Sequence, residues 1–158
     1  MKIIAAQTDE QIAEARGLFQ QYADELGVDL CFQGFEEELA HLQEKYGLPD
    51  GAILLALEDQ KTVGCVALRK FQDNICEMKR LFVRPQFRGK GVGRALAQAI
   101  IEKAIALGYS KMYLDTLETL KEAMGLYCSL GFRKRDPYYD NPLPNVVYWE
   151  LDLNIKSG

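Results

Sequence analysis

The sequence predicts an α/β protein with a mixed, mostly antiparallel sheet of about seven strands, flanked by about four helices in a single domain over residues 1–158. Three observations lead to this prediction. Short β-branched runs alternate with longer amphipathic segments along the chain. The three strands before residue 84 are separated by short polar connections, which are typical of antiparallel hairpins. A helical segment then joins the fourth strand to the fifth, and such a crossover makes the two strands parallel.

A first helix is expected after a short strand at residues 2–6. Residues 8–11 have the spacing of a capping box, and apolar residues then recur at helical intervals up to a loop at residues 27–34. A second amphipathic pattern covers residues 35–46. His41 lies outside its apolar stripe, so we expect this side chain on the solvated surface.

The remaining strands are bounded by polar or glycine-containing connections. They are expected at residues 52–57, 62–70, 75–83, 109–116, 132–135 and 146–153. A long apolar helical pattern starts at a cluster of glycines and stops at Gly108, and another helix is expected at residues 119–130. A loop dense in turn residues and aromatic rings follows at residues 136–145.

Length and composition suit a protein with one core. The chain has 158 residues, of which 48% are hydrophobic. Its formal net charge of -4 argues against nucleic acid as a partner, because binding to a phosphate backbone needs a basic surface. No apolar run reaches the about 20 residues of a membrane span, and residues 1–7 lack the pattern of a signal peptide. We therefore expect a cytoplasmic protein that binds neither nucleic acid nor a membrane.

The cysteines show neither a metal pattern nor a disulfide pattern. They are widely spaced, lack a Cys-x-x-Cys pair and accompany a single histidine. We therefore expect no metal. Buried reduced thiols are expected at Cys31, Cys65, Cys76 and Cys128.

Residues 88–94 read Arg-Gly-Lys-Gly-Val-Gly-Arg and link a strand to a helix. Free backbone N–H groups and the positive end of the helix dipole meet there, and glycine lets a ligand approach the backbone, so the turn suits a phosphate or pyrophosphate. The spacing excludes a P-loop, which needs Gly-Lys-Ser/Thr, and a dinucleotide fingerprint, which needs Gly-x-Gly-x-x-Gly. The pattern that does match is Arg-x-x-Gly-x-Gly, formed by Arg88, Gly91 and Gly93.

This turn resembles the pyrophosphate loop of the GNAT superfamily of N-acetyltransferases. Residues 81–85 and the Tyr-x-x-x-Gly-Phe segment within residues 126–132 are similar to further parts of that family. The resemblance implies an acetyl-CoA-dependent N-acetyltransferase whose parallel strand pair splays apart to admit the pantetheine arm of the coenzyme. It implies coenzyme contacts at Leu81, Phe82, Val83, Arg88, Gly89, Lys90, Gly91, Val92, Gly93 and Arg94.

The resemblance also suggests two catalytic residues. Tyr127 has the position of the general acid that protonates the departing thiolate, and a phenol with a pKa of about 10 stays protonated at neutral pH. Glu77 has the position of a general base, which is useful because an alkyl ammonium must lose a proton at a cost of about 4.6 kcal/mol. The alternatives are a core tyrosine and a surface ion pair. Backbone N–H groups of residues 81–83, Val83 in particular, would stabilise the carbonyl oxygen. Leu120 replaces an asparagine that many family members carry.

The acceptor is expected between the loops at residues 27–34 and 136–145, which carry aromatic side chains and are long enough to border a slot beyond the thioester. The residues expected to contact it are Phe32, Tyr138, Tyr139 and Asn141. Four acidic residues would favour a small cationic amine. These are Asp29, Glu77, Asp136 and Asp140. The structural alternatives are a core plug at Phe32 and a stiff strand connection in the second loop.

Two other functions fit the same motifs. One is a non-catalytic coenzyme A-binding or regulatory domain, and the other is a protein lysine or N-terminal acetyltransferase. The presence of both Glu77 and Tyr127 favours an enzyme over a binding domain. The sequence leaves the identity of the acceptor open, and it is compatible with a homodimer.

Overall fold

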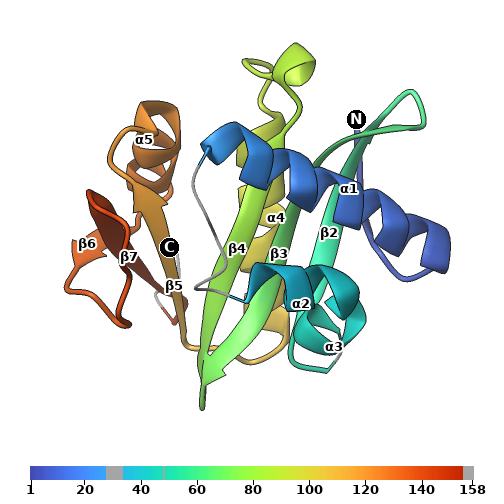
Figure 1. Ribbon diagram of the computed structural model, residues 1–158. Helices are drawn as coiled ribbons and strands as arrows, with labels where there is room; N and C mark the ends of the chain where they lie inside the picture. Colours follow the sequence, from blue (N-terminus) through green and yellow to red (C-terminus); the bar gives the residue numbers. More distant parts are fainter. Residues whose placement is uncertain (28–33, 48, 155–158) are drawn as a thin grey trace.

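The computed structural model describes residues 1–27, 34–47 and 49–154, which contain one seven-stranded sheet (Figure 1). The strands are β1 Lys2–Ala5, β2 Ala52–Glu58, β3 Lys61–Gln72, β4 Ile75–Val83, β5 Lys111–Leu117, β6 Arg133–Arg135 and β7 Val146–Asp152. They lie in the order β1-β2-β3-β4-β5-β7-β6, and every neighbouring pair is antiparallel except β4 with β5. The predicted mixed sheet with one parallel pair is therefore confirmed.

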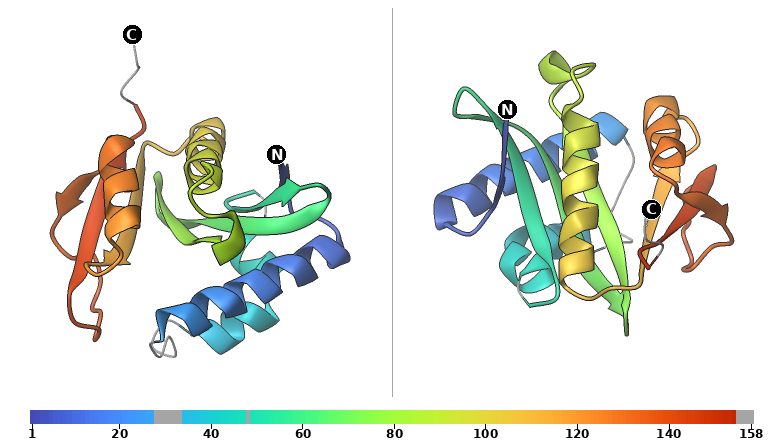
Figure 2. Two further views of the ribbon diagram at one scale, coloured as in Figure 1. Left: turned by 90° about the horizontal axis from the view of Figure 1, so that it is seen from above. Right: turned by 180° about the vertical axis from the view of Figure 1, so that it is seen from behind.

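Helices cover both faces of this sheet. They are α1 Asp9–Leu26, α2 Phe35–Ala40, α3 Leu42–Tyr46, α4 Val92–Ala106 and α5 Lys121–Ser129, and a 3-10 turn spans Pro85–Phe87. Figure 2 shows α1 and α2 on one side of the sheet and α4 on the other. The predicted capping box precedes α1, because Thr8 accepts from the Gln11 N–H and the Gln11 side chain accepts from the Thr8 N–H. No helix within the described ranges is long and apolar enough to cross a membrane.

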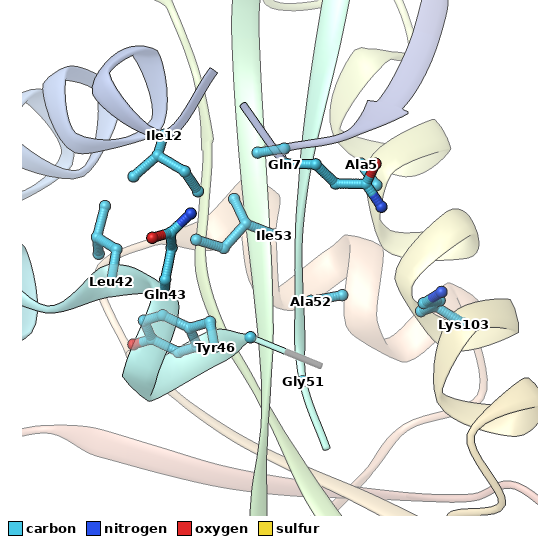
Figure 3. Close-up of a pocket in the computed structure, with 12 residues that line it drawn as sticks. Ala5, Gln7, Ile12, Leu42, Gln43, Tyr46, Gly51, Ala52, Ile53 and Lys103 are labelled. Carbon is cyan, nitrogen blue, oxygen red and sulfur yellow. The ribbon is translucent and has the colours of Figure 1, made fainter. Parts of the chain in front are cut away.

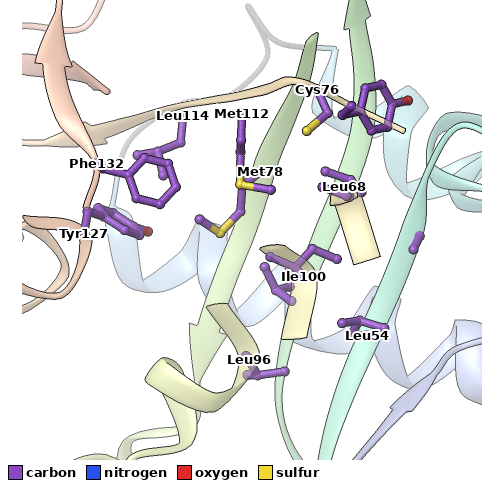
Figure 4. Close-up of a cluster of buried hydrophobic side chains, with 14 of the residues drawn as sticks. Leu54, Leu68, Cys76, Met78, Leu96, Ile100, Met112, Leu114, Tyr127 and Phe132 are labelled. Carbon is purple, nitrogen blue, oxygen red and sulfur yellow. The ribbon is translucent and has the colours of Figure 1, made fainter. Parts of the chain in front are cut away.

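Two apolar clusters, one on each face, hold the helices on the sheet. On the α4 and α5 side, Leu96, Ile100 and Tyr127 pack with Met78 and Met112 of the strands (Figure 4). The cluster beneath α1 and α3 includes Leu18, Phe19, Leu42, Tyr46, Ile53 and Leu55. Neighbouring residues of β2 alternate between the two clusters, because successive side chains of a strand point to opposite faces. This burial on both faces explains why β2 is a continuous apolar run in the sequence.

One predicted helix is divided. Residues 35–46 form α2 and α3, because the backbone at His41 leaves the helical region with φ -133° and ψ 47°. The carbonyl of Leu39, which a continuous helix would pair with the N–H of residue 43, accepts a hydrogen bond from Arg16 Nε at 2.7 Å. The described ranges therefore contain five α-helices rather than about four, and His41 is exposed as predicted.

Of the three cysteines among the described residues, two are buried and one is exposed. Cys65 and Cys76 are buried as predicted, whereas Cys128 is exposed on α5. The prediction was wrong for Cys128 because Tyr127 faces the core and the next residue of a helix points about 100° away. Cys31 lies outside the described residues. Within the described ranges, no group of three or more His, Cys, Asp or Glu side chains could hold a metal ion.

The parallel strands β4 and β5 pair over three residues and then separate. The pairs join residues 75–77 to residues 111–113, and beyond them the two strands diverge (Figure 1). A bulge bends β4 just past this point, since Arg80 and Leu81 together oppose Val66 of β3. The expected splay of the parallel pair is confirmed.

Arg80 occupies the bulge with φ 62°, which is a strained conformation for a residue with a side chain. Its guanidinium forms a buried bidentate pair with Glu38 of α2, at 2.9 Å through Nε and 2.8 Å through a terminal nitrogen. Burial raises the pKa of Glu38, but the hydrogen bonds and charge of Arg80 outweigh it and the pKa is lowered. This ion pair fixes α2 to the bend of β4, where the candidate site lies.

Candidate active site

A slot of about 80 Å³ lies where β4 and β5 separate. Its walls are residues 78–81 of β4 and residues 114–116 of β5. Tyr22 of α1 and Tyr127 of α5 also line it, together with Leu120 and Ala123. The slot is therefore bounded by both core strands and by helices from both faces of the sheet.

A larger cavity of about 630 Å³ adjoins the slot. It is bordered by residues 81–83 at the end of β4, by Arg88, by residues 119–123 and by the last turn of α1. The residues that it shares with the slot are Tyr22, Leu81, Leu120 and Ala123. The two spaces are therefore adjacent, and the larger one lies beside the glycine turn.

A third cavity, of about 30 Å³, also shares walls with the slot. The shared residues are Tyr22, Asp115, Thr116 and Leu120. Asn141 and Leu143 of the loop at residues 136–145 complete it, together with Val146 of β7. We refer to this space as the acceptor-side cavity, because it lies at the loop that was predicted to contact the acceptor.

The glycine turn has the geometry of an anion site. Gly89 and Gly91 have φ 79° and 84°, and nothing lies within 4 Å of where a Cβ would stand on either residue. No side chain caps α4, and its first helical hydrogen bond runs from the Ala95 N–H to the Gly91 carbonyl. The N–H groups of residues 92–94 precede this bond, so they have no partner within the helix and can face a ligand.

Arg88 is held at the mouth of the large cavity. Its Nε donates to the Val83 carbonyl at 2.8 Å, and its two terminal nitrogens donate to the Glu25 carboxylate of α1. The hydrogen bond from Arg88 lowers the pKa of Glu25. Since Arg88 already pairs with a carboxylate, an anion bound at this turn would compete with Glu25 for it.

The predicted coenzyme contacts fall into two groups. Those that line the large cavity are Leu81, Phe82, Val83 and Arg88. Those that lie in the adjoining turn and at the start of α4 are Gly89, Lys90, Gly91, Val92, Gly93 and Arg94. The side chain of Val92 is buried in the apolar cluster beneath α4, so only its backbone is available to a ligand.

Tyr127 lies on the buried face of α5 and is 7% exposed. Its ring packs edge-to-face against Phe132 and Trp149, with centroids 5.7 and 6.2 Å away. Burial raises the pKa of the hydroxyl, and the nearby Tyr22 and Asp115 raise it further. The phenol therefore stays protonated at neutral pH. Tyr127 is a core residue that also lines the slot, and its role as general acid stays a prediction.

Glu77 lies where β4 and β5 separate and is 1% exposed. Its carboxylate accepts from Arg69 Nε at 2.9 Å and from the Tyr138 hydroxyl at 2.7 Å. Burial raises its pKa, but the charges of Lys79 and Arg69 outweigh burial and the pKa is lowered. The alternative ion pair is present, although it is buried rather than at the surface. The general-base role of Glu77 stays a prediction.

Tyr138 packs into an aromatic cluster on the side of Glu77. Its ring lies 5.1 Å from that of Phe71 on β3 and 4.9 Å from that of Tyr113 on β5. Its hydroxyl donates a hydrogen bond to the Glu77 carboxylate. Tyr138 lines none of the three cavities described above, so its contact with the acceptor stays a prediction.

The other residues of the loop turn toward β5. The Tyr139 hydroxyl donates to Asp115, and Asn141 Nδ2 donates to the same carboxylate at 3.2 Å. Asn141 also lines the acceptor-side cavity. Phe32 and Asp29 lie outside the described residues.

Comparison with known proteins decides the family. A model described as the acetyltransferase (GNAT) family matches residues 15–132, which is most of the chain. The chain belongs to the GNAT acetyltransferase family. Members of this family are acyltransferases that use acetyl-CoA as cosubstrate and an amine as acceptor, so the predicted enzyme class and cosubstrate are confirmed.

Two relatives are similar to this GNAT enzyme over most of its sequence. An uncharacterized N-acetyltransferase of Schizosaccharomyces pombe is 45% identical over 156 residues, covering 98% of this chain and 96% of the relative. The N-acetylaspartate synthetase of Danio rerio is 35% identical over 117 residues, covering 73% of this chain but 42% of the relative.

Solved structures agree with the fold. A GNAT acetyltransferase from Staphylococcus aureus Mu50 has a TM-score of 0.80 at 20% identity and covers 97% of this chain and 99% of its own. The PaiA N-acetyltransferase of Thermoplasma acidophilum, solved with coenzyme A, has a TM-score of 0.72 at 16% identity and covers 96% of this chain and 99% of its own. At these identities the likeness shows the fold alone.

The GNAT site also contains residues that the sequence analysis did not single out as site residues. Tyr22 looked like an ordinary member of an apolar helix face, yet it lines all three cavities. Asp115 did leave a signal, because it is a charge in the middle of strand β5 that follows the apolar residues 112–114. Leu120, in the place of the family's asparagine, lines all three cavities and adds apolar surface there.

A separate cavity of about 290 Å³ lies between α1, α3, β2 and α4 (Figure 3). Its walls are mostly apolar, and its polar side chains include Gln7, Gln43 and Lys103. It shares no lining residue with the slot or its two neighbouring cavities. It therefore takes no part in the candidate site.

Proposed function

We propose that this GNAT enzyme transfers the acetyl group of acetyl-CoA to the primary amine of a small molecule inside the slot between β4 and β5. The observation that carries the proposal is the arrangement of the three cavities. The slot shares walls with the large cavity beside the glycine turn and with the acceptor-side cavity. Two ligands bound in these neighbouring cavities could thus meet at the slot.

The coenzyme would lie along the large cavity. Its pyrophosphate would bind the N–H groups and basic side chains of residues 88–94, and its pantetheine arm would follow residues 81–83. Those strand residues have β3 on one side and, past Glu77, no strand partner on the other. Their free backbone groups can therefore bind an amide-containing arm, and Val83 is our proposed donor to the thioester carbonyl oxygen.

The chemistry needs one proton donor within the slot. The amine nitrogen bonds to the thioester carbon, the carbon–sulfur bond breaks, and the released thiolate takes a proton from the Tyr127 hydroxyl. Burial raises the pKa of this phenol, but it destabilises a buried thiolate in the same way, so the transfer stays feasible. The nitrogen loses its own protons to solvent.

The charges of the slot favour an acceptor that carries a carboxylate as well as an amine. Lys79 lines one wall and Asp115 the other, while Arg80 beside Lys79 is paired with Glu38. Of the carboxylates predicted to attract a cation, Glu77 is buried in an ion pair, while Asp136 and Asp140 are exposed and line none of the three cavities. The relatives named N-acetylaspartate synthetase agree with this choice. We therefore propose an acidic amino acid such as L-aspartate, and the predicted small cationic amine is the competing class.

A panel of acceptors tests this function. The purified protein would be given acetyl-CoA with L-aspartate, L-glutamate, a neutral amino acid, spermidine, an aminoglycoside or a lysine-containing peptide, and release of the free coenzyme A thiol would be measured. The highest kcat/KM is expected for L-aspartate or L-glutamate. If kcat/KM is highest for spermidine, the acceptor is a small cationic amine, as the sequence predicted. If kcat/KM is highest for the peptide, the enzyme is a protein acetyltransferase.

A further inference from the structure

Asp115 lies on β5 two positions past Tyr113, the last residue of that strand to pair with β4. It lines both the slot and the acceptor-side cavity. Among the described residues that line these two spaces, it is the sole carboxylate. An amine between the acceptor-side cavity and the slot would therefore lie beside this carboxylate.

The loop at residues 136–145 holds one oxygen of this carboxylate. The Tyr139 hydroxyl and Asn141 Nδ2 both donate to Oδ2 of Asp115. Asn141 is itself fixed, because its Oδ1 accepts from the Leu143 N–H at 2.9 Å and its Nδ2 also donates to the Tyr139 oxygen at 2.8 Å. Within the described residues no hydrogen bond reaches Oδ1. The side chain is thus oriented through one oxygen and has the other available to a ligand.

The negative charge of Asp115 affects other groups that line the slot. It raises the pKa of Tyr22 and of Tyr127, both of which line the slot, in addition to the effect of burial. Of the cations on the facing wall, Arg80 is neutralised by its bidentate pair with Glu38. The β5 wall is therefore the acidic side of the slot, and an ammonium group would be attracted to it.

We propose that Asp115 binds the amine of the acceptor, with its Oδ1 accepting a hydrogen bond from the ammonium and directing the nitrogen toward the thioester. This inference rests on the proposed function. In the reaction the ammonium gives one proton to solvent, the carbon–nitrogen bond forms, and the nitrogen gives a second proton to solvent. The carbon–sulfur bond breaks, Tyr127 protonates the thiolate, and the Tyr127 hydroxyl regains its proton from solvent. Tyr139 and Asn141 are positioning residues that act through Asp115.

The substitution Asp115→Asn tests the proposal at nearly constant side-chain volume. An amide can keep one oxygen for Tyr139 and Asn141, but it then presents an N–H donor to the ammonium instead of an acceptor. We expect KM for L-aspartate to rise by about 10- to 100-fold, because a hydrogen bond to a charged group is lost. The affinity for coenzyme A, measured by calorimetry, should stay within about twofold, since Asp115 does not line the large cavity.

Product inhibition separates recognition of charge from a merely structural role. N-acetyl-L-aspartate has an amide in place of the ammonium, so Asp115→Asn should leave its inhibition constant unchanged while KM for L-aspartate rises. Asp73→Asn is the matched control, because it makes the same chemical change in the exposed turn between β3 and β4 and should alter neither constant. If another amine in the panel has the highest kcat/KM, the same experiment uses that amine in place of L-aspartate and its N-acetyl product in place of N-acetyl-L-aspartate.

The experiments distinguish failure of this inference from failure of the proposed function. If the unaltered protein acetylates no amine in the panel, both the proposed function and this inference are wrong. If the unaltered protein is active and Asp115→Asn leaves KM for the amine unchanged, this inference alone is wrong. A rise of equal size in KM and in the product inhibition constant would also overturn it, since Asp115 would then shape the cavity without recognising the charge.

Discussion

At the scale of single residues, Tyr127 has the two properties that a proton donor to a thiolate requires. Its hydroxyl has a raised pKa, so it carries its proton at neutral pH, and the residue lines the slot. We expect Tyr127→Phe to lower kcat by about 10²-fold or more when chemistry limits the rate, and to leave the affinity for acetyl-CoA nearly unchanged. Steady-state kinetics and calorimetry measure the two quantities.

Tyr109 supplies the control for this substitution. It is as buried as Tyr127, at 7% exposure, and its hydroxyl donates to the Asp50 carbonyl away from the site. Tyr109→Phe should cost some stability and leave kcat unchanged. Equal values of kcat for Tyr127→Phe and the unaltered protein, with chemistry shown to be limiting, would leave Tyr127 with a packing role alone.

The role of Glu77 could not be decided from the residue pattern of its strand. A carboxylate within an apolar strand fits both a general base and an ion pair, and the strand pattern does not distinguish them. The contacts with Arg69 and Tyr138 come from β3 and from a loop that lies 61 residues further along the chain. Only the assembled sheet brings these partners together, and their net effect is a lowered pKa.

At the scale of elements, the start of α4 is the part of the site that local sequence specifies best. We expect Gly91→Ala to weaken coenzyme A binding by about 10- to 100-fold, because a methyl group at this position would obstruct the approach of the pyrophosphate to the N–H groups. The residue has φ 84°, so the substitution should also cost about 1–2 kcal/mol in stability. Calorimetric binding and thermal unfolding measure these effects.

The control lies at the other end of the same helix. Gly108 has φ 93°, and nothing lies within 4 Å of where its Cβ would stand, so Gly108→Ala imposes a similar backbone strain in similarly open space. Both variants should lose similar stability, and only Gly91→Ala should lose affinity. If the two variants bind coenzyme A equally well, the pyrophosphate does not bind at this turn.

At the scale of the whole molecule, two ion pairs with buried carboxylates connect parts of the sheet and its helices. Glu38 of α2 pairs with Arg80 of β4, and Glu77 of β4 pairs with Arg69 of β3. The pKa of each carboxyl group is lowered in the folded protein. Such a group stabilises the fold above its unfolded pKa of about 4.3, and this stabilisation is lost as the pH falls through the folded pKa.

We therefore expect the melting temperature to fall as the pH drops below about 4.3, and part of this fall to depend on Glu38. Glu38→Gln should lower the free energy of unfolding at neutral pH by about 3–5 kcal/mol, because it leaves the buried guanidinium of Arg80 without its counter-charge. The difference from the unaltered protein should shrink in acid, where Glu38 becomes protonated. Calorimetric unfolding between neutral and acidic pH measures both effects.

Glu44→Gln is the matched control for this experiment. The Glu44 side chain is 78% exposed on α3, so the substitution should change the free energy of unfolding by less than about 0.5 kcal/mol. A Glu38→Gln variant that is as stable as the Glu44→Gln variant at neutral pH would show that the Arg80 pair does not stabilise the fold.

Most elements of the fold could be predicted because their signals are local. Apolar periodicity marked the strands and the longer helices, and the crossover through α4 determined the parallel direction of β5 relative to β4. The division at His41 could not be predicted, since it involves a hydrogen bond from Arg16, a residue of another helix. The exposure of Cys128 depends on which face of α5 meets the sheet, and a short helix defines that face poorly from sequence alone.

The sequence by itself determined the glycine turn, the order of helices and strands along the chain and the family resemblance, because each depends on residues that are neighbours in the chain. Tertiary structure decided what surrounds the reaction point. The bulge at Arg80 and the early end of the β4–β5 pairing open the slot, and Tyr22 and Asp115 reach it from segments more than 90 residues apart. The physical reason is that cavities and ion pairs form between segments distant in the chain, whose contacts exist only after the sheet has assembled.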